Sequence, residues 1–165
     1  MESIELDAID WRLLDALQRD ASLSNQDLAA QVHVSPPTCL RRVRRLREAG
    51  LIEREVALLN PERVAQHLGH GLQAIVEVSL ERQEAAWLDA FEQRVAADDA
   101  VAQCWRVSPG PDFVLVVQVS DMPAYQALAQ RLFTAEAQVR NVRAFFALKR
   151  VKFEPKIPIP SAKRS

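Results

Sequence analysis

The chain has 165 residues, of which 48% are hydrophobic and 26% charged, and a formal net charge of −1. This balance is ordinary for a globular protein and argues against an intrinsically disordered chain. The longest apolar runs, such as residues 113–117, fall far short of the roughly 20 residues of a membrane helix, and the first residues do not resemble a signal peptide, so we expect a cytoplasmic protein without a membrane partner.

Three short helices are predicted at the N-terminus. Asp7, Ser24 and Ser35 each precede an apolar pattern of helical spacing and are typical N-cap residues. The second helix is expected to end near residues 31–33, and the third to begin with Pro36 and end at Gly50. This layout, with a tight connection between the second and third helices, predicts a helix-turn-helix unit whose last helix enters the major groove of DNA.

The third helix carries five arginines in seven residues, at 41, 42, 44, 45 and 47, and no acid. If Cys39, Val43 and Leu46 face the core, most of these arginines project from the opposite side, where guanidinium groups suit phosphates and guanine edges. The alternative is a solvated face that pairs with acids of the first helix. Hydroxyls at the helix N-terminus are expected to hold a phosphate, with simple capping as their alternative. The predicted contacts to double-stranded DNA are Ser35, Pro36, Thr38, Arg41, Arg42, Arg44 and Arg45.

The segment after Gly50 is predicted to connect two domains. Residues 51–59 are a strand candidate, Asn60 and Pro61 stop that strand, and a short helical turn is expected near residues 62–65. Residues 67–71, with two glycines, are typical of a domain boundary.

The remaining pattern predicts a second domain of class α+β. Apolar residues alternate over residues 72–80, and helical spacing follows at Leu88, Phe91 and Val95. Two further strands, a helix capped by Asp121 and a long last strand over residues 139–151 complete the order βαββαβ, the ferredoxin-like arrangement. The predicted domains are a helix-turn-helix domain at 1–52, a strand and linker at 53–71, a ligand-sensing and oligomerisation domain at 72–153 and an extended tail at 154–165.

Helices on only one side of such a sheet leave its other side bare. Depending on register, the bare face carries Ile75, Val114, Val116, and Phe145 or Phe146. A patch of this size is unusual on a monomer, so a homodimer at least is expected.

Several motifs, in order along most of the chain, resemble the Lrp/AsnC family of transcriptional regulators, also called feast/famine regulatory proteins. They are residues 6–10 (Leu-Asp-Ala-Ile-Asp), the run from Ser35 to Ile52, Ala-Leu-Leu-Asn-Pro at 57–61 and Asp-Met-Pro-Ala-Tyr at 121–125. The resemblance implies an N-terminal winged helix-turn-helix that binds DNA, and a C-terminal domain whose dimers commonly assemble into octamers. It also implies that an amino acid or related metabolite binds between dimers, near the turn joining the second and third strands of that domain.

By position, the resemblance places effector contacts at nine residues, which are Arg106, Ser108, Pro109, Gly110, Asp112, Met122, Phe145, Phe146 and Ala147. Asp112 is placed to accept hydrogen bonds from an α-ammonium group, and Arg106 to face a carboxylate. The turn departs from the family's Gly-Asp-aromatic-Asp-aromatic run, because Pro109, Gly110 and Pro111 precede Asp112. The alternatives are a structural turn aspartate, packing aromatics, and a DNA-binding regulator or architectural protein without an amino-acid effector.

An enzyme is the first competing interpretation. The sequence shows no carboxylate pair, nucleophile with its base, glycine-rich phosphate loop or metal-ligand set, so no catalysis, cofactor or metal is expected. Cys39 and Cys104 lie in apolar patterns and are expected to be reduced and buried. A metabolite-binding assembly protein that has lost DNA binding is the second competitor, and the arginine-rich helix argues against it.

Overall fold

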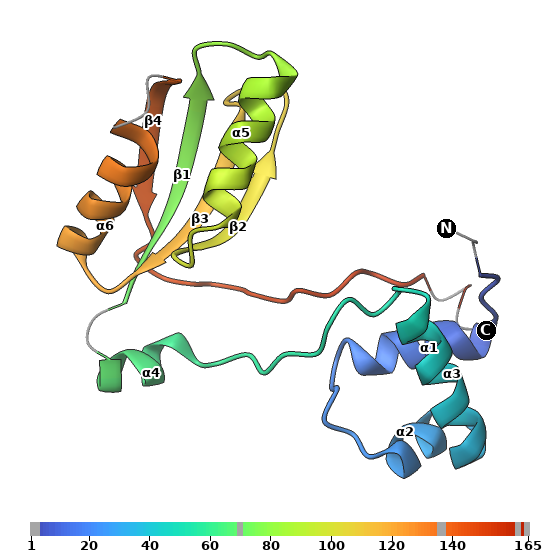
Figure 1. The fold of residues 1–165 in the computed structure, drawn as a ribbon. Coiled ribbons are helices and arrows are strands. Elements are labelled where there is room, and N and C mark those ends of the chain that lie inside the picture. The colour runs from blue at the N-terminus through green and yellow to red at the C-terminus, as the bar shows by residue number, and fades with distance from the viewer. Residues whose placement is uncertain (1–3, 69–70, 135–137, 161–162, 164–165) are drawn as a thin grey trace. The chain divides into compact units, whose positions relative to one another are not determined.

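The computed structural model describes residues 4–68, 71–134, 138–160 and 163. Contacts divide the chain into two compact units, whose elements are labelled in Figure 1. The N-terminal unit consists of Met1–Leu58 together with Lys152–Ser165, and the C-terminal unit is Leu59–Val151. The C-terminal tail thus belongs to the same unit as the first helices. Gly69 and His70, within the predicted linker, lie outside the described residues.

The N-terminal unit contains the three predicted helices, α1 (Ala8–Leu17), α2 (Asn25–Gln31) and α3 (Pro36–Glu48). The side chains of Asp7, Ser24 and Ser35 each accept a hydrogen bond from a backbone N–H in the first turn, which confirms all three predicted caps. Gly50 has a φ of 72°, the left-handed conformation expected after the last turn of α3.

A small apolar core joins these helices. Leu13 of α1, Leu28 of α2 and Leu46 of α3 are buried, as their helical spacing predicts. The Asn25 side chain donates a hydrogen bond of 2.9 Å to the carbonyl of Pro36, which ties the start of α2 to the start of α3. The core and this bond together fix the angle at which α3 is presented.

The prediction of a strand over residues 51–59 is wrong for this structure. The segment is irregular, and Val56, Leu58 and Leu59 are all exposed. A strand needs a neighbour that pairs with its backbone, and the described part of the chain provides none for this segment. Residues 51–59 therefore have a sequence that suits a strand, but no strand lies beside them to pair with.

The C-terminal tail contacts α1 through a pair of hydrogen bonds. The Gln18 side chain donates from Nε2 to the carbonyl of Ile157 at 2.8 Å and accepts the Ile157 N–H on Oε1 at 2.9 Å. A hollow of about 840 Å³ lies between α1, residues 51–58 and the tail. Its apolar lining includes Trp11, Leu14, Leu17, Ile52, Val56, Leu58, Pro155, Ile157 and Ile159.

We expect Gln18→Ala to release the tail locally, because it removes both hydrogen bonds to Ile157. The amide of Ile157 should exchange its hydrogen faster in the variant, as measured by hydrogen–deuterium exchange. Gln26→Ala, an exposed change in α2, is the matched control and should leave that rate unchanged. An Ile157 amide that exchanges equally fast in both variants would show that Gln18 does not hold the tail.

The C-terminal unit follows the predicted order of elements. After α4 (Pro61–Leu68), longer than predicted, come β1 (Leu72–Leu80), α5 (Ala85–Ala96), β2 (Val101–Arg106), β3 (Phe113–Val119), α6 (Met122–Ala129), a π-helical turn (Gln130–Thr134) and β4 (Val139–Phe146). The Asp121 side chain accepts a hydrogen bond of 2.8 Å from Ala124 N–H, which confirms the predicted cap of α6. The order βαββαβ is confirmed.

The last strand is shorter than predicted. Phe146 lies opposite Ala74, and the N–H of Ala147 donates to the carbonyl of Gln73. Because β1 begins at Leu72, the residues after Ala147 have no backbone of β1 beside them to pair with. The prediction that the strand continues to Val151 is therefore wrong.

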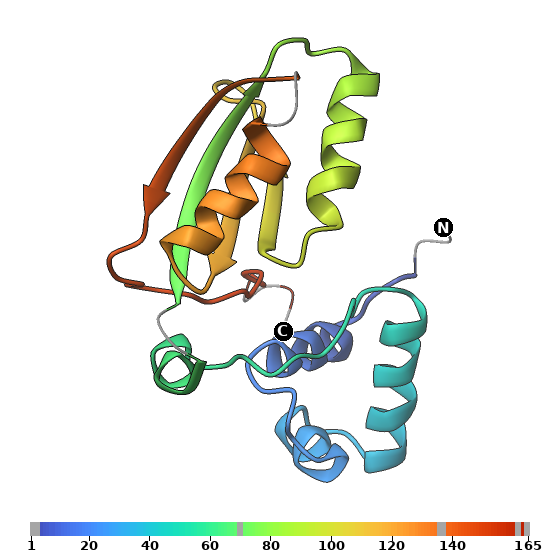
Figure 2. The same ribbon diagram turned by 60° about the vertical axis from the view of Figure 1, so that its left-hand side comes forward.

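The four strands form one antiparallel sheet in the order β2-β3-β1-β4. Figure 2 shows α5 and α6 together on one side of this sheet. Alternate residues of β1 and β3, such as Val76 and Leu115, are buried against Phe91 of α5 and Leu128 of α6. The domain is ferredoxin-like, as predicted.

The opposite side of the sheet is open. Ile75 of β1 lies between Val116 of β3 and Phe145 of β4, and Trp105 of β2 lies opposite Val114. Ile75 is 44% exposed, Phe145 46% and Trp105 59%. Phe146 points to the other side, where its ring meets Tyr125 of α6 edge-on at 5.0 Å. We call Ile75, Trp105, Val114, Val116 and Phe145 the open face.

Candidate DNA-binding and effector sites

Asp10 is buried where α1 meets α3, with only 1% of its side chain exposed. Its carboxylate accepts hydrogen bonds from Arg42 Nη1 at 2.9 Å and from Arg45 Nη2. It also accepts the backbone N–H of Asp7 at 3.2 Å, which completes a capping box at the start of α1. Removing one partner from a buried ion pair typically costs about 3–5 kcal/mol, so this network resists disruption.

Asp7 adds a second carboxylate to the same network. Arg42 Nη1 donates to Asp7 Oδ2 at 2.8 Å. Desolvation raises the pKa of Asp7, but hydrogen bonds from the backbone of Asp10 and from Arg42 outweigh it and hold that pKa below its ordinary value. The hydrogen bonds that Arg42 donates to Asp10 and Asp7 raise the pKa of Arg42 in turn.

This network corrects the predicted direction of two of the α3 arginines. Arg42 and Arg45 do not project away from the first helix, because both turn back to Asp10. Only 17% of the Arg42 side chain is exposed, and the Nε atoms of both arginines are buried. For these two residues the alternative of pairing with acids of the first helix is the one observed. The sequence analysis missed the burial of Asp10, although its place in the predicted capping box was a signal.

The other arginines of α3 are exposed. Arg44 pairs with Glu48 at 2.7 Å and Arg47 with Glu55 at 2.5 Å, and both arginine side chains are at least half exposed. Arg41 is exposed and forms no ion pair with any residue that the structure describes. Exposed pairs contribute roughly 0–1 kcal/mol, so a phosphate can replace Glu48 or Glu55 at little cost.

The start of α3 presents two hydroxyls. The Ser35 Oγ and Thr38 Oγ1 atoms lie 2.8 Å apart, and the Ser35 Oγ accepts the N–H of Thr38 at 3.4 Å. Ser35 and Pro36 are exposed, and Thr38 is half-buried. The capping geometry is therefore present, and a phosphate contact at this end stays a prediction.

In the C-terminal unit, the turn between β2 and β3 is held by Asp112. Its Oδ2 accepts the N–H of Leu80 at 2.7 Å, and its Oδ1 accepts the Gln83 side chain at 2.8 Å. Arg106 pairs with Asp89 at 3.1 Å and with Glu92 at 2.7 Å, both on α5. Both side chains predicted to bind an amino acid are thus engaged within the unit, whereas Ser108, Pro109 and Gly110 form an exposed turn.

The nine predicted effector residues form two groups at opposite ends of the sheet. The turn residues lie beside the end of β1, where Asp112 meets Leu80. Phe146 and Ala147 lie beside its beginning, opposite Ala74 and Gln73. Met122 belongs to the same group, because it begins α6 three residues after Val119, which lies opposite Leu72. Six residues of strand span about 20 Å, so within one chain the two groups cannot contact the same small ligand. The side chain of Phe145 is also separated from that of Phe146, because it lies on the open face of the sheet and Phe146 points to the other side.

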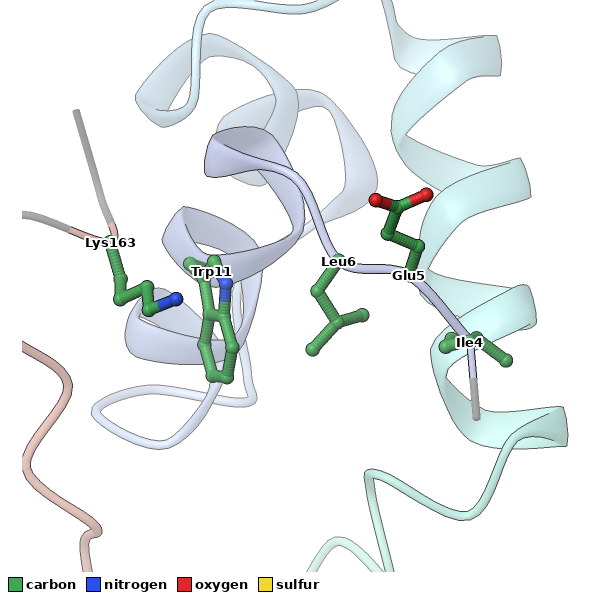
Figure 3. A pocket seen from close by; sticks show the side chains of 5 residues that line it. All are labelled: Ile4, Glu5, Leu6, Trp11 and Lys163. Atoms are coloured by element: carbon green, nitrogen blue, oxygen red, sulfur yellow. The ribbon is translucent and has the colours of Figure 1, made fainter. Parts of the chain in front are cut away.

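Two hollows in the N-terminal unit are lined by other residues than these. Besides the hollow beside the tail, a hollow of about 560 Å³ lies between residues 4–6 and Trp11, and Figure 3 shows Lys163 directed toward the Trp11 indole.

Among the residues that the structure describes, no three His, Cys, Asp or Glu side chains could jointly hold a metal ion. No helix in the same ranges is both long and apolar enough to cross a membrane.

The helices, caps and exposed arginines of the N-terminal unit, together with the ferredoxin-like sheet, define a DNA-binding protein with a second, separate domain. The family model for the winged helix-turn-helix DNA-binding domain matches residues 6–53, and that for the Lrp/AsnC ligand-binding domain matches residues 73–157. The chain belongs to the Lrp/AsnC family and is a DNA-binding transcriptional regulator with a ligand-binding domain.

Known proteins resemble the chain along nearly its full length. It is 40% identical to the leucine-responsive regulatory protein of Rhizobium meliloti, covering 90% of this chain and 93% of the relative. It is 38% identical to the Bkd operon transcriptional regulator of Pseudomonas aeruginosa, covering 94% and 99%. A transcriptional regulator of Neisseria meningitidis, solved in complex with L-Met, matches with a TM-score of 0.84 at 30% identity, covering 96% and 99%.

Proposed function

We propose that α3 binds double-stranded DNA through the exposed face formed by Arg41 and Arg44, with Ser35, Pro36 and Thr38 at its N-terminus beside a phosphate. The observation that carries this proposal is the division of the α3 arginines into two held by buried Asp10 and others that are exposed. Guanidinium groups at the surface of a helix-turn-helix recognition helix suit phosphates and guanine edges.

Salt dependence tests this assignment. Each phosphate neutralised adds about 0.9 to the slope of log affinity against log salt concentration. We therefore expect Arg41→Gln and Arg44→Gln each to make the slope shallower by about that amount, measured by fluorescence anisotropy on a labelled duplex of random sequence. Arg82→Gln, which removes an exposed arginine from the C-terminal unit, is the matched control. Slopes equal to that of the control would refute the assignment.

We infer that the chain forms a homodimer through the open face, with dimers assembling further, up to the octamer that the family resemblance implies. The exposed apolar side chains of the open face support this inference, as do the exposed side chains of Val56, Leu58 and Leu59 in the segment without a partner strand. A second copy would bury both, which offsets the cost of leaving them in water.

We further propose that the effector is an amino acid or a related small metabolite, bound where subunits meet. The L-Met complex of the Neisseria meningitidis regulator supports this class of ligand. The separation of the two groups of predicted residues supports a site between subunits, because two chains can bring together what one chain holds apart. The competing proposal is a regulator whose turn at Pro109 binds no amino acid.

Thermal unfolding in the presence of each of the twenty amino acids separates these two proposals. A ligand at 100 times its dissociation constant adds about 2.7 kcal/mol to the stability of the native state, so its midpoint should rise. We expect Met122→Lys to abolish the rise, because Met122 is exposed in the second group of predicted contacts. Ala127→Lys, on another side of α6, is the control and should keep it. If no amino acid raises the midpoint, the proposal of an amino-acid effector is wrong.

A further inference from the structure

The α3 arginines differ in the exposure of the carboxylates that they would leave without a partner if they moved to DNA phosphates. Glu48, the partner of Arg44, is 63% exposed, so water solvates its carboxylate as soon as Arg44 leaves. Asp10 is buried, so its carboxylate would stay out of water without a counter-charge if Arg42 and Arg45 left. A phosphate can therefore compete for Arg44 but not, on equal terms, for Arg42 or Arg45.

The position of Asp10 follows from the local sequence. As the third residue of α1, it closes the capping box with Asp7, and that box fixes the carboxylate at the end of α1 that meets α3. From there its two oxygens receive one arginine each. The same residue thus helps to cap one helix and orients two side chains of another.

We propose that Asp10 is a positioning residue for DNA binding: it holds Arg42 and Arg45 against α1 and so limits the number of α3 arginines that meet DNA phosphates. This inference rests on the proposed DNA-binding role of α3. It assigns Arg42 and Arg45 to the support of the recognition helix and gives α1 control over the non-specific affinity of α3.

The test uses the full-length protein and the labelled duplex of random sequence. Arg42→Gln and Arg45→Gln should leave the salt slope unchanged, although Arg41→Gln lowers it. Asp10→Asn should make the slope steeper by about 0.9 for each arginine that it releases, and should raise the affinity for random DNA. Asp7→Asn is the matched control, because Arg42 keeps its bond to Asp10 there and the slope should not change.

Unfolding curves for every variant separate loss of fold from loss of positioning, since a purely structural role for Asp10 would lower stability without a steeper slope. If Asp10→Asn does not fold, Arg45→Gln decides, because the Arg45 side chain is 43% exposed and its loss should be tolerated. A slope for Arg45→Gln that falls as far as that for Arg41→Gln overturns the proposal, as does an unchanged slope for folded Asp10→Asn. Slopes unaffected by Arg41→Gln and Arg44→Gln would instead refute the proposed DNA face itself.

Discussion

Ile75→Asp is expected to convert the proposed dimer into monomers. Ile75 lies at the middle of the open face, between Val116 and Phe145, and a second copy placed there would enclose its side chain. An unpaired carboxylate enclosed in this way costs far more than the apolar contact it replaces. Sedimentation velocity should show the change as a fall in mass to that of one chain.

The control for this experiment is Gln126→Glu, which adds the same charge at an exposed position of α6. It should sediment as the unaltered protein does. Circular dichroism should show that Ile75→Asp keeps its secondary structure, since Ile75 is outside the apolar core in the single chain. An Ile75→Asp protein that sediments like the control would place the dimer contact elsewhere.

Local signals account for most of what the sequence predicted correctly. The caps at Asp7, Ser24, Ser35 and Asp121 depend on residues within one turn of each other, and the burial of Val76 and Leu115 depends on strand alternation alone. The predicted order of elements follows from these patterns because each one is complete within a short stretch of chain.

The errors come from contacts between distant parts of the chain. Arg42 and Arg45 turn toward Asp10 because of the angle between α1 and α3, which no helical spacing reveals. The strand predicted to reach Val151 stops where β1 supplies no further partner, although its apolar character continues. The same limit applies to residues 51–59, whose sequence suits a strand that has no neighbour within the described chain.

The effector residues show a different limit. The resemblance aligned nine positions with a ligand site, but it contained no information on which chain supplies each of them. The antiparallel pairing of β1 with β3 and β4 sets the two groups at opposite ends of the sheet. Position in a motif therefore predicted residue types, whereas the register of the strands determines which of them are neighbours.

Asp112→Ala is expected to lower the stability of the C-terminal unit. The variant leaves the N–H of Leu80 buried without an acceptor and releases the Gln83 side chain, at a cost of about 1–3 kcal/mol. For a domain of this size, the unfolding midpoint should fall by roughly 10 °C, as measured by scanning calorimetry. Asp112→Asn, which keeps an oxygen for Leu80, should lose less.

Asp99→Ala, an exposed change in the same unit, is the control and should leave the free energy of unfolding within about 0.5 kcal/mol of that of the starting protein. The same series distinguishes the two roles of Asp112. If Asp112→Ala unfolds early yet still responds to an amino acid, the carboxylate acts by joining the turn to β1 and other groups bind the ligand. If its midpoint is unchanged and only the response is lost, Asp112 binds the effector directly, and its bonds to Leu80 and Gln83 contribute little to the fold.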